Sequence, residues 1–262
     1  MKKSYLIITI LLLALGAACF ICFDAIQIRL LANDTADALL RGFLSRIGLC
    51  PLFIFLLIIS GGKYLVLFRK EFPRMLLWSL PCLMVAFVNF PYSGVISKTI
   101  TFHGSNWMWL YILYVISIAL LEEFVFRGVL FITVKDMFKN KRHAPLLTVV
   151  VCAAAFSLIH LTNLIYGADI GLTLLQCLYT FLIGAMLTVT VMKTKNIWIC
   201  VLIHALFDFG GLLTANKVGI ASGDPWDLVF WILTIASGVL CAGHIIFSLI
   251  RLEKDYVSGS TI

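Results

Sequence analysis

Ionisable side chains are rare inside the apolar stretches of this sequence, and those present gather in three of them. They are Glu122, Glu123 and Arg127 in one stretch, His160 in the next, and His204 and Asp208 in a later one. If these stretches cross a membrane, each ionisable group is costly and therefore a candidate for function. We expect Glu122, His160 and His204 to converge around one water-accessible cavity.

The spacing of the two adjacent glutamates predicts different roles for them. Residues four apart share a face of an α-helix, so Glu123 and Arg127 are placed to form an ion pair. Glu122 points about 100° away from Glu123, since a helix has about 3.6 residues per turn. Arg127 can therefore hold one carboxylate while Glu122 faces a cavity.

The two histidines also have neighbours one helical turn away. His204 and Asp208 present two polar groups from one stripe, and Phe156 places an aromatic ring beside His160. These patterns also have purely structural explanations, because intramembrane ion pairs and His–Asp pairs can simply hold helices together. His244 has no acidic or histidine neighbour on its helix, so we interpret it as structural.

Together these groups could hydrolyse an acyl bond. A carboxylate and an imidazole can activate water as general bases, and a second histidine can donate hydrogen bonds to a developing oxyanion. Glu122, His160 and His204 would also make a plausible zinc site, similar to the His₂Glu sets of catalytic zinc. Both routes stay open at this point, so the expected cofactor is none or zinc.

The composition requires a membrane protein. The hydrophobic fraction is 62%, the charged fraction 13%, and the mean hydropathy +1.06, in a chain of 262 residues. A soluble protein of this composition would expose large apolar patches, and a disordered one would be far more polar. We therefore predict an all-α, polytopic helical bundle in the cell membrane, with the lipid bilayer as its surroundings and no nucleic acid as a partner.

About eight stretches are long and apolar enough to cross a bilayer as helices. They cover residues 5–23, 43–60, 75–92, 107–134, 145–163, 171–192, 196–213 and 227–250. Pro81 predicts a kink in the third stretch. We expect the first stretch to remain as an uncleaved helix rather than a signal peptide, because no clear cleavage site follows it.

The distribution of Lys and Arg predicts the orientation. With both termini in the cytoplasm, the inner segments carry fourteen of these residues and the outer segments five. The five outer residues are Arg29, Arg41, Arg46, Lys98 and Lys217. This asymmetry follows the positive-inside rule and explains the formal net charge of +7.

Nearly all of the eight cysteines fall in apolar runs, which favours buried thiols over a disulfide framework. Cys19 and Cys22 form a C-x-x-C on an apolar helix. A redox or metal role for that pair has no supporting context, so we interpret both as packing residues.

The three motifs resemble those of the CPBP family, which comprises CAAX proteases and bacteriocin-processing enzymes and is also called the Abi family. The matching residues are Glu122-Glu123-Phe-Val-Phe-Arg127 for E-E-x-x-x-R, Phe156-Ser-Leu-Ile-His160 for F-x-x-x-H, and His204-Ala-Leu-Phe-Asp208 for H-x-x-x-N/D. Each motif alone is weak, whereas the ordered trio on successive apolar stretches is specific. The resemblance covers about residues 107–213.

The resemblance implies an intramembrane endopeptidase with an all-helical fold. It assigns water activation to Glu122 and His160, and oxyanion stabilisation to His204 and the residue at position 208. Glu123 and Arg127 would be supporting residues. Family members have been described both as zinc metalloproteases and as metal-independent glutamic proteases, so the resemblance leaves the metal open.

Two positions depart from the family pattern. Asp208 stands where the eukaryotic pattern has Asn, and an ionised Asp cannot donate a hydrogen bond. Asp208 would therefore serve an oxyanion hole only if it were protonated, or by orienting His204. Gly184 is followed four residues later by Thr188 rather than by a second very small residue, which makes close helix packing there less certain.

We divide the chain into N-terminal transmembrane helices without an assigned role (1–106), a CPBP-like catalytic core (107–213), and a C-terminal helix with a short cytoplasmic tail (214–262). The expected partner is a peptide or membrane-protein substrate. The alternatives are a non-catalytic bacteriocin-immunity or scaffold protein of the same fold and a proton-coupled transporter. Against a transporter, the sequence shows no inverted repeat.

Overall fold

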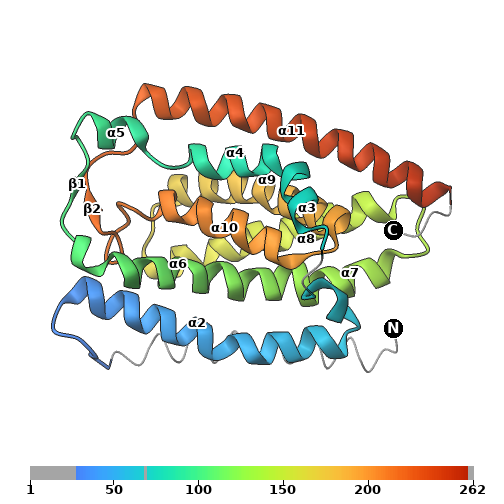
Figure 1. The fold of residues 1–262 in the computed structure, drawn as a ribbon, viewed down its shortest axis with the longest axis horizontal. Helices are drawn as coiled ribbons and strands as arrows, with labels where there is room; N and C mark the ends of the chain where they lie inside the picture. Colours follow the sequence, from blue (N-terminus) through green and yellow to red (C-terminus); the bar gives the residue numbers. More distant parts are fainter. Residues whose placement is uncertain (1–27, 68–69, 259–262) are drawn as a thin grey trace.

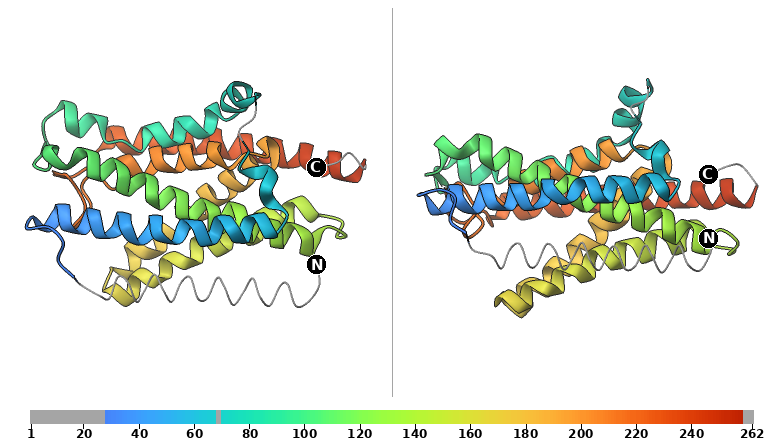
Figure 2. Two further views of the ribbon diagram at one scale, coloured as in Figure 1. Left: turned by 60° about the horizontal axis from the view of Figure 1, so that its bottom comes forward. Right: turned by 90° about the horizontal axis from the view of Figure 1, so that it is seen from below.

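The computed structural model describes residues 28–67 and 70–258 as a bundle of helices. The main helices are α2 (Asp34–Ile59), α4 (Leu80–Val88), α6 (Met108–Glu123), α8 (Ala144–Leu158), α9 (Ile170–Thr194), α10 (Ile197–Gly211) and α11 (Leu228–Val257). Helices α2, α6, α10 and α11 run along the long axis of the molecule (Figure 1). Helices α8 and α9 cross the bundle at an angle, and the ends that join them project from it (Figure 2). The predicted all-α fold is confirmed.

Four helices in the described part of the chain are long and apolar enough to cross a membrane. They are Asp34–Ile59, Ala144–Ile165, Ile170–Thr194 and Leu228–Val257, and Ile197–Gly211 is a shorter apolar helix. The predicted spans 145–163, 171–192, 196–213 and 227–250 correspond to α8, α9, α10 and α11. The predicted span 5–23, with Cys19 and Cys22, lies outside the described residues.

Helix α2 begins earlier than the predicted span at residue 43. The side chain of Asn33 caps it by accepting a hydrogen bond from the Ala36 N–H at 2.9 Å. Asp37 in the first turn pairs with Arg41 at 3.0 Å, so the helix continues through residues too polar for the hydropathy pattern. Arg41 and Arg46 are therefore helical residues of α2.

The predicted span 75–92 is broken into two helices. Helix α3 (Phe72–Trp78) ends at Ser79, and α4 begins immediately after it with Pro81 in its first turn. Proline has no N–H for the preceding turn, which accounts for the break. The predicted kink near Pro81 is therefore present.

The predicted span 107–134 is one continuous helical path made of three consecutive segments. It consists of α6, the π-helix η3 (Phe124–Leu130) and α7 (Phe131–Phe138). Short π-helical segments inside α-helices are rare and are frequent at functional sites. Here the π-helix begins directly after the two adjacent glutamates.

The remaining elements are short and lie in the connections. They are η1 (Gly62–Leu65), α5 (Tyr92–Ile96), β1 (Thr101–Phe102), η2 (Ser105–Trp107), η4 (Ile159–Tyr166) and β2 (Ala221–Ser222). Strands β1 and β2 pair antiparallel, with Thr101 opposite Ser222. This ribbon ties the segment before α6 to the segment after α10 at one end of the bundle (Figure 1).

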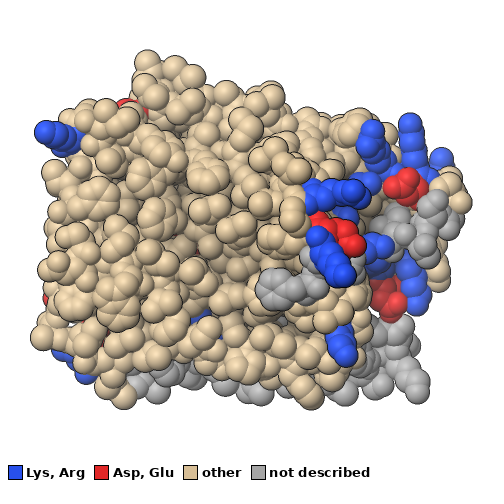
Figure 3. All heavy atoms as spheres, viewed as in Figure 1, with Lys and Arg blue, Asp and Glu red and all other residues tan. Residues whose placement is uncertain are grey.

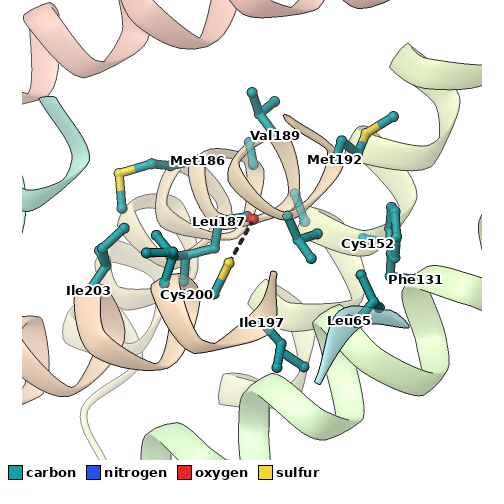
Figure 4. Packing of buried hydrophobic residues seen from close by; sticks show 14 of the residues in the cluster. Leu65, Phe131, Cys152, Met186, Leu187, Val189, Met192, Ile197, Cys200 and Ile203 are labelled. Carbon is teal, nitrogen blue, oxygen red and sulfur yellow. Dashed lines mark hydrogen bonds between the residues drawn. The ribbon is translucent and has the colours of Figure 1, made fainter. Parts of the chain in front are cut away.

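The largest core cluster joins α9 and α10 to the surrounding helices (Figure 4). Leu187 and Cys200 face each other there, and the Cys200 thiol donates to the Leu187 carbonyl oxygen at 3.4 Å. The described cysteines are all free thiols, and Cys177 alone among them is only half-buried. The interpretation of these cysteines as apolar packing residues agrees with this structure.

Basic residues gather at the end of the bundle where α11 ends (Figure 3). Lys193 pairs with Asp255 of α11 at 3.5 Å, and Tyr256 donates to the Lys139 carbonyl oxygen. The middle of the face shown in Figure 3 carries few charges, as expected for a surface in contact with lipid.

Candidate active site

The site is built on the end of α6 and the middle of α10, with Glu123 at its centre. The predicted ion pair is present: Arg127 Nη1 donates to Glu123 Oε1 at 2.9 Å, and both side chains are at most 1% exposed. The same Glu123 oxygen accepts from His204 Nδ1 at 2.8 Å. One carboxylate therefore holds a guanidinium and an imidazole whose positions in the sequence are far apart.

The second nitrogen of His204 faces two further carboxylates. His204 Nε2 lies 3.4 Å from Asp208 Oδ2 and 3.7 Å from Glu122 Oε2. Glu122 is 32% exposed and Asp208 17%, whereas Glu123 is fully buried. Because carboxylates face both ring nitrogens, a doubly protonated His204 can donate on each side.

Phe156 packs against Arg127 and both histidines of the site. The Arg127 guanidinium lies 4.2 Å from its ring centroid, a cation–π distance. The rings of His160 and His204 meet Phe156 edge-on, with centroids 5.4 and 5.8 Å away. Phe156 was selected from the sequence only as a neighbour of His160, yet it is the side chain that the two histidines share.

His160 lies at the edge of this group. It sits in η4, and its Nδ1 is 2.9 Å from the Phe156 carbonyl oxygen. A carbonyl can only accept, so Nδ1 donates and Nε2 of the neutral ring keeps a lone pair. Both His160 and Glu122 are described, and no hydrogen bond or ion pair joins them. The structure therefore brings Glu122, His204 and Asp208 together directly, and His160 only through Phe156.

Helix α8, which carries Phe156, packs tightly against α9. A Cβ at Gly184 would lie 3.0 Å from Ala153 Cα and 3.3 Å from the Phe156 ring. Thr188 does not disturb this contact, because it is buried and donates to the Gly184 carbonyl oxygen at 2.7 Å. Close packing at this motif therefore needs one glycine rather than two small residues.

Residues outside the three motifs hold the end of α10 in place. Tyr111 donates its hydroxyl to the Phe209 carbonyl oxygen at 2.7 Å, and the Asn89 amide donates to Phe207 at the same distance. These bonds flank Asp208 on both sides. Sequence reasoning missed Tyr111 and Asn89 because neither residue type is unusual in an apolar helix.

An open apolar groove of about 480 Å³ lies beside the site. Its lining residues are Phe126, Ala155, Leu158, Ile159, Leu161, Thr162 and Ile165. The Phe126 ring meets Phe156 edge-on at 5.1 Å, so Phe126 and Phe156 connect the groove lining to Arg127 and His204.

The zinc alternative does not fit this arrangement. In the described parts of the chain, no three His, Cys, Asp or Glu side chains are grouped as metal ligands would be. Of the predicted zinc set, His204 directs one nitrogen to Glu123, and His160 is not joined to Glu122. We therefore derive no step through a metal.

The comparisons with known proteins identify one match. Residues 104–210 match the family model described as type II CAAX prenyl endopeptidase Rce1-like. This segment begins before α6 and ends within α10, so it contains every residue of the three motifs. Neither a curated protein nor a solved structure matches the chain.

Proposed function

Residues 104–210 belong to the Rce1-like family of type II CAAX prenyl endopeptidases, and we propose that this chain is an intramembrane endopeptidase that cleaves a peptide or membrane-protein substrate. The observation that carries the proposal is the cluster around His204. Its two ring nitrogens meet Glu123 on one side and Glu122 with Asp208 on the other. A histidine that only holds two helices together would need one such contact, whereas His204 has three.

In the proposed mechanism, Glu122 and His160 accept the proton of the attacking water. Glu122 is the glutamate of the pair that remains partly exposed, and His160 keeps the lone pair of Nε2 because Nδ1 donates to a carbonyl. Water adds to the substrate carbonyl, and the proton is then passed to the leaving amine. Such general acid–base catalysis contributes typically about 10²–10⁴-fold in rate.

His204 stabilises the oxyanion of the tetrahedral intermediate through Nε2. Glu123 holds the opposite nitrogen at 2.8 Å and so fixes the direction in which the ring donates. Arg127 holds the Glu123 carboxylate in place through the ion pair at 2.9 Å. Preorganised donors of this kind act without reorganisation during the reaction, which is the source of their effect.

The test compares the membrane peptides of cells that make the wild type, Glu122→Gln or His204→Ala. We expect at least one cleavage product to vanish with both variants. Glu71→Gln is the matched control, because Glu71 is exposed at the start of α3 and remote in sequence from the motifs. Identical peptide profiles would contradict the proposal, and a Glu122→Gln variant that keeps its cellular phenotype would favour the scaffold or immunity alternative.

Chelation tests the choice between metal-independent and zinc-dependent hydrolysis. Once a cleavage product is known, we expect its formation by the purified protein to survive exhaustive chelation. Loss of activity that returns on adding zinc would contradict the metal-independent route.

A further inference from the structure

The last turn of α10 carries Asp208 and ends in a way that leaves a carbonyl group without its helical donor. The final carbonyl oxygens of a helix have no intrahelical partner. Here the Leu213 N–H, which would ordinarily bond to the Phe209 carbonyl oxygen, bonds to that of Gly210 at 3.3 Å. The Leu212 N–H bonds to the Asp208 carbonyl oxygen at 2.9 Å. The Phe209 carbonyl therefore depends on a donor from outside the helix.

Side chains of two other helices supply donors to this turn. Tyr111 of α6 is fully buried, and its hydroxyl donates to the Phe209 carbonyl oxygen at 2.7 Å. The side-chain amide of Asn89, at the end of α4, donates to the Phe207 carbonyl oxygen at 2.7 Å. The carbonyl groups immediately before and after Asp208 are thus held from two different elements.

Two glycines let the end of α4 lie directly against the same turn. A Cβ at Gly210 would lie 2.6 Å from the Asn89 carbonyl oxygen and 2.7 Å from Phe90 Cα. A Cβ at Gly211 would lie 2.8 Å from Asn89 Nδ2. The rings of Phe90 and Phe209 stack beside this contact, with centroids 6.1 Å apart. Backbone contact therefore adds to the two hydrogen bonds in positioning the turn.

The position of this turn decides where Asp208 lies relative to His204. Asp208 Oδ2 is 3.4 Å from His204 Nε2, and Glu122 Oε2 is 3.7 Å from the same nitrogen. Glu123 holds the opposite ring nitrogen at 2.8 Å from α6. A displaced last turn of α10 would move Asp208 away from Nε2 and leave the bond to Glu123 in place.

We propose that Asn89 and Tyr111 are positioning residues: they hold the last turn of α10 so that Asp208 stays beside His204 Nε2 and keeps the ring oriented toward the oxyanion. This proposal deepens the proposed function and rests on it for the role of His204. An aspartate suits position 208, because orienting the ring needs an acceptor rather than a donor. Asn89 lies outside the matched residues 104–210, so the segment before the motifs takes part in building the site.

Steady-state kinetics with the purified protein and the peptide that yields the cleavage product test the effect on the reaction. Asn89→Leu removes the amide and keeps the branching of the side chain, and Tyr111→Phe removes only the hydroxyl. Each variant should lower kcat about 10- to 100-fold and leave KM within about twofold, because His204 contacts the oxyanion only during the reaction.

Tyr256→Phe is the matched control for the kinetics. The Tyr256 hydroxyl also donates to a backbone carbonyl oxygen, that of Lys139 at the basic end of the bundle, so this variant should keep the kcat of the wild type. An unchanged kcat for Asn89→Leu or Tyr111→Phe would overturn the proposal for that residue. A rise in KM without a fall in kcat would overturn it as well, because the residue would then act on substrate binding.

NMR of nitrogen-labelled histidine rings tests the positioning without a substrate. The chain has five histidines, so the signals are few, and His204→Ala identifies those of His204. Asn89→Leu and Tyr111→Phe should move the Nε2 signal toward its position in Asp208→Asn and leave the Nδ1 signal unchanged. Tyr256→Phe should match the wild type. An Nε2 signal that does not move, or equal shifts in every histidine, would overturn the proposal.

The two measurements separate this proposal from the proposed function. A wild type that cleaves no peptide would contradict the proposed function, and the Nε2 signal would still decide whether Asn89 and Tyr111 position Asp208.

Discussion

Glu123 is the residue on which most of the site depends. One of its oxygens accepts from both Arg127 and His204, while the other, Oε2, is buried and has no hydrogen-bond partner in the structure. A buried oxygen in this state is costly, and a water or a substrate donor could satisfy Oε2. Replacing either Arg127 or His204 should therefore affect both folding and catalysis.

The first prediction concerns Arg127. Arg127→Ala should destabilise the protein by roughly 3–5 kcal/mol, because it leaves a buried charge without its partner. The same variant removes the cation from the face of Phe156. Thermal unfolding of the purified protein and its abundance in membranes measure the effect.

Lys139→Ala is the control for Arg127→Ala. Lys139 pairs with Asp136 at 2.8 Å but is 56% exposed, so its removal should cost only about 0–1 kcal/mol. If both variants were equally abundant and stable, the buried ion pair would not contribute to folding.

At the scale of the elements, the contact between α8 and α9 positions Phe156 and with it both histidines. Gly184→Ala should destabilise the protein by about 1–3 kcal/mol, since the added methyl group would overlap Ala153 and the Phe156 ring. Activity should fall as well, because a shift of α8 moves Phe156 and His160. Thermal unfolding and the cleavage product provide the two measurements.

Gly238→Ala on α11 is the matched control. A Cβ at Gly238 has no neighbour within 4 Å, so this variant should be neutral or stabilising by up to about 1 kcal/mol through helix propensity. If the Gly184→Ala protein were as stable as Gly238→Ala, α8 and α9 would accommodate the extra methyl group without loss of stability.

The start of α11 predicts a dependence of stability on pH. Hydrogen bonds from Ser93 and from the Phe230 N–H, which lies at 2.8 Å, hold the pKa of Asp227 below its ordinary value of 3.8. Asp227 caps α11 at its N-terminus, outside the membrane-spanning segment. A lowered carboxyl pKa in the folded state stabilises the protein above pH 3.8, and this contribution is lost as the pH falls through the folded-state pKa.

Asp227→Asn isolates this contribution, because Asn remains a capping residue but does not ionise. The wild type should be more stable than Asp227→Asn above about pH 4, and the difference should shrink on further acidification. Melting curves of the two proteins over a pH series measure it. A difference in Tm that does not change with pH would show that the charge of Asp227 does not contribute to stability.

The whole molecule has one strongly basic end, and we predict that this end faces the cytoplasm. The C-terminal end of α11 lies there, tied to α9 by the Lys193–Asp255 pair and to the segment before α8 by the Glu253–His143 pair. A reporter fused after Ile262 should therefore report a cytoplasmic location, and one inserted beside the β1–β2 ribbon an external one. A fusion after Ile262 that reports the outside would reverse the orientation.

The local features of this protein were determined by the sequence. The Glu123–Arg127 pair follows from two residues one turn apart, and the break at Ser79 follows from Pro81, so neither depends on the rest of the fold. Hydropathy located most of the long helices, since lipid contact requires apolar residues over the whole length of a span. It missed the start of α2, where the Asn33 cap and the Asp37–Arg41 pair stabilise a polar first segment.

The assembly of the site was decided by the tertiary structure. Glu123 and His204 are 81 residues apart, so the bond between them depends on how α6 and α10 pack. Glu122 of α6 likewise faces His204 of α10 only because these two helices pack together. Spacing along one helix determines which side chains share a face, but which faces meet depends on side-chain volumes contributed by several helices at once.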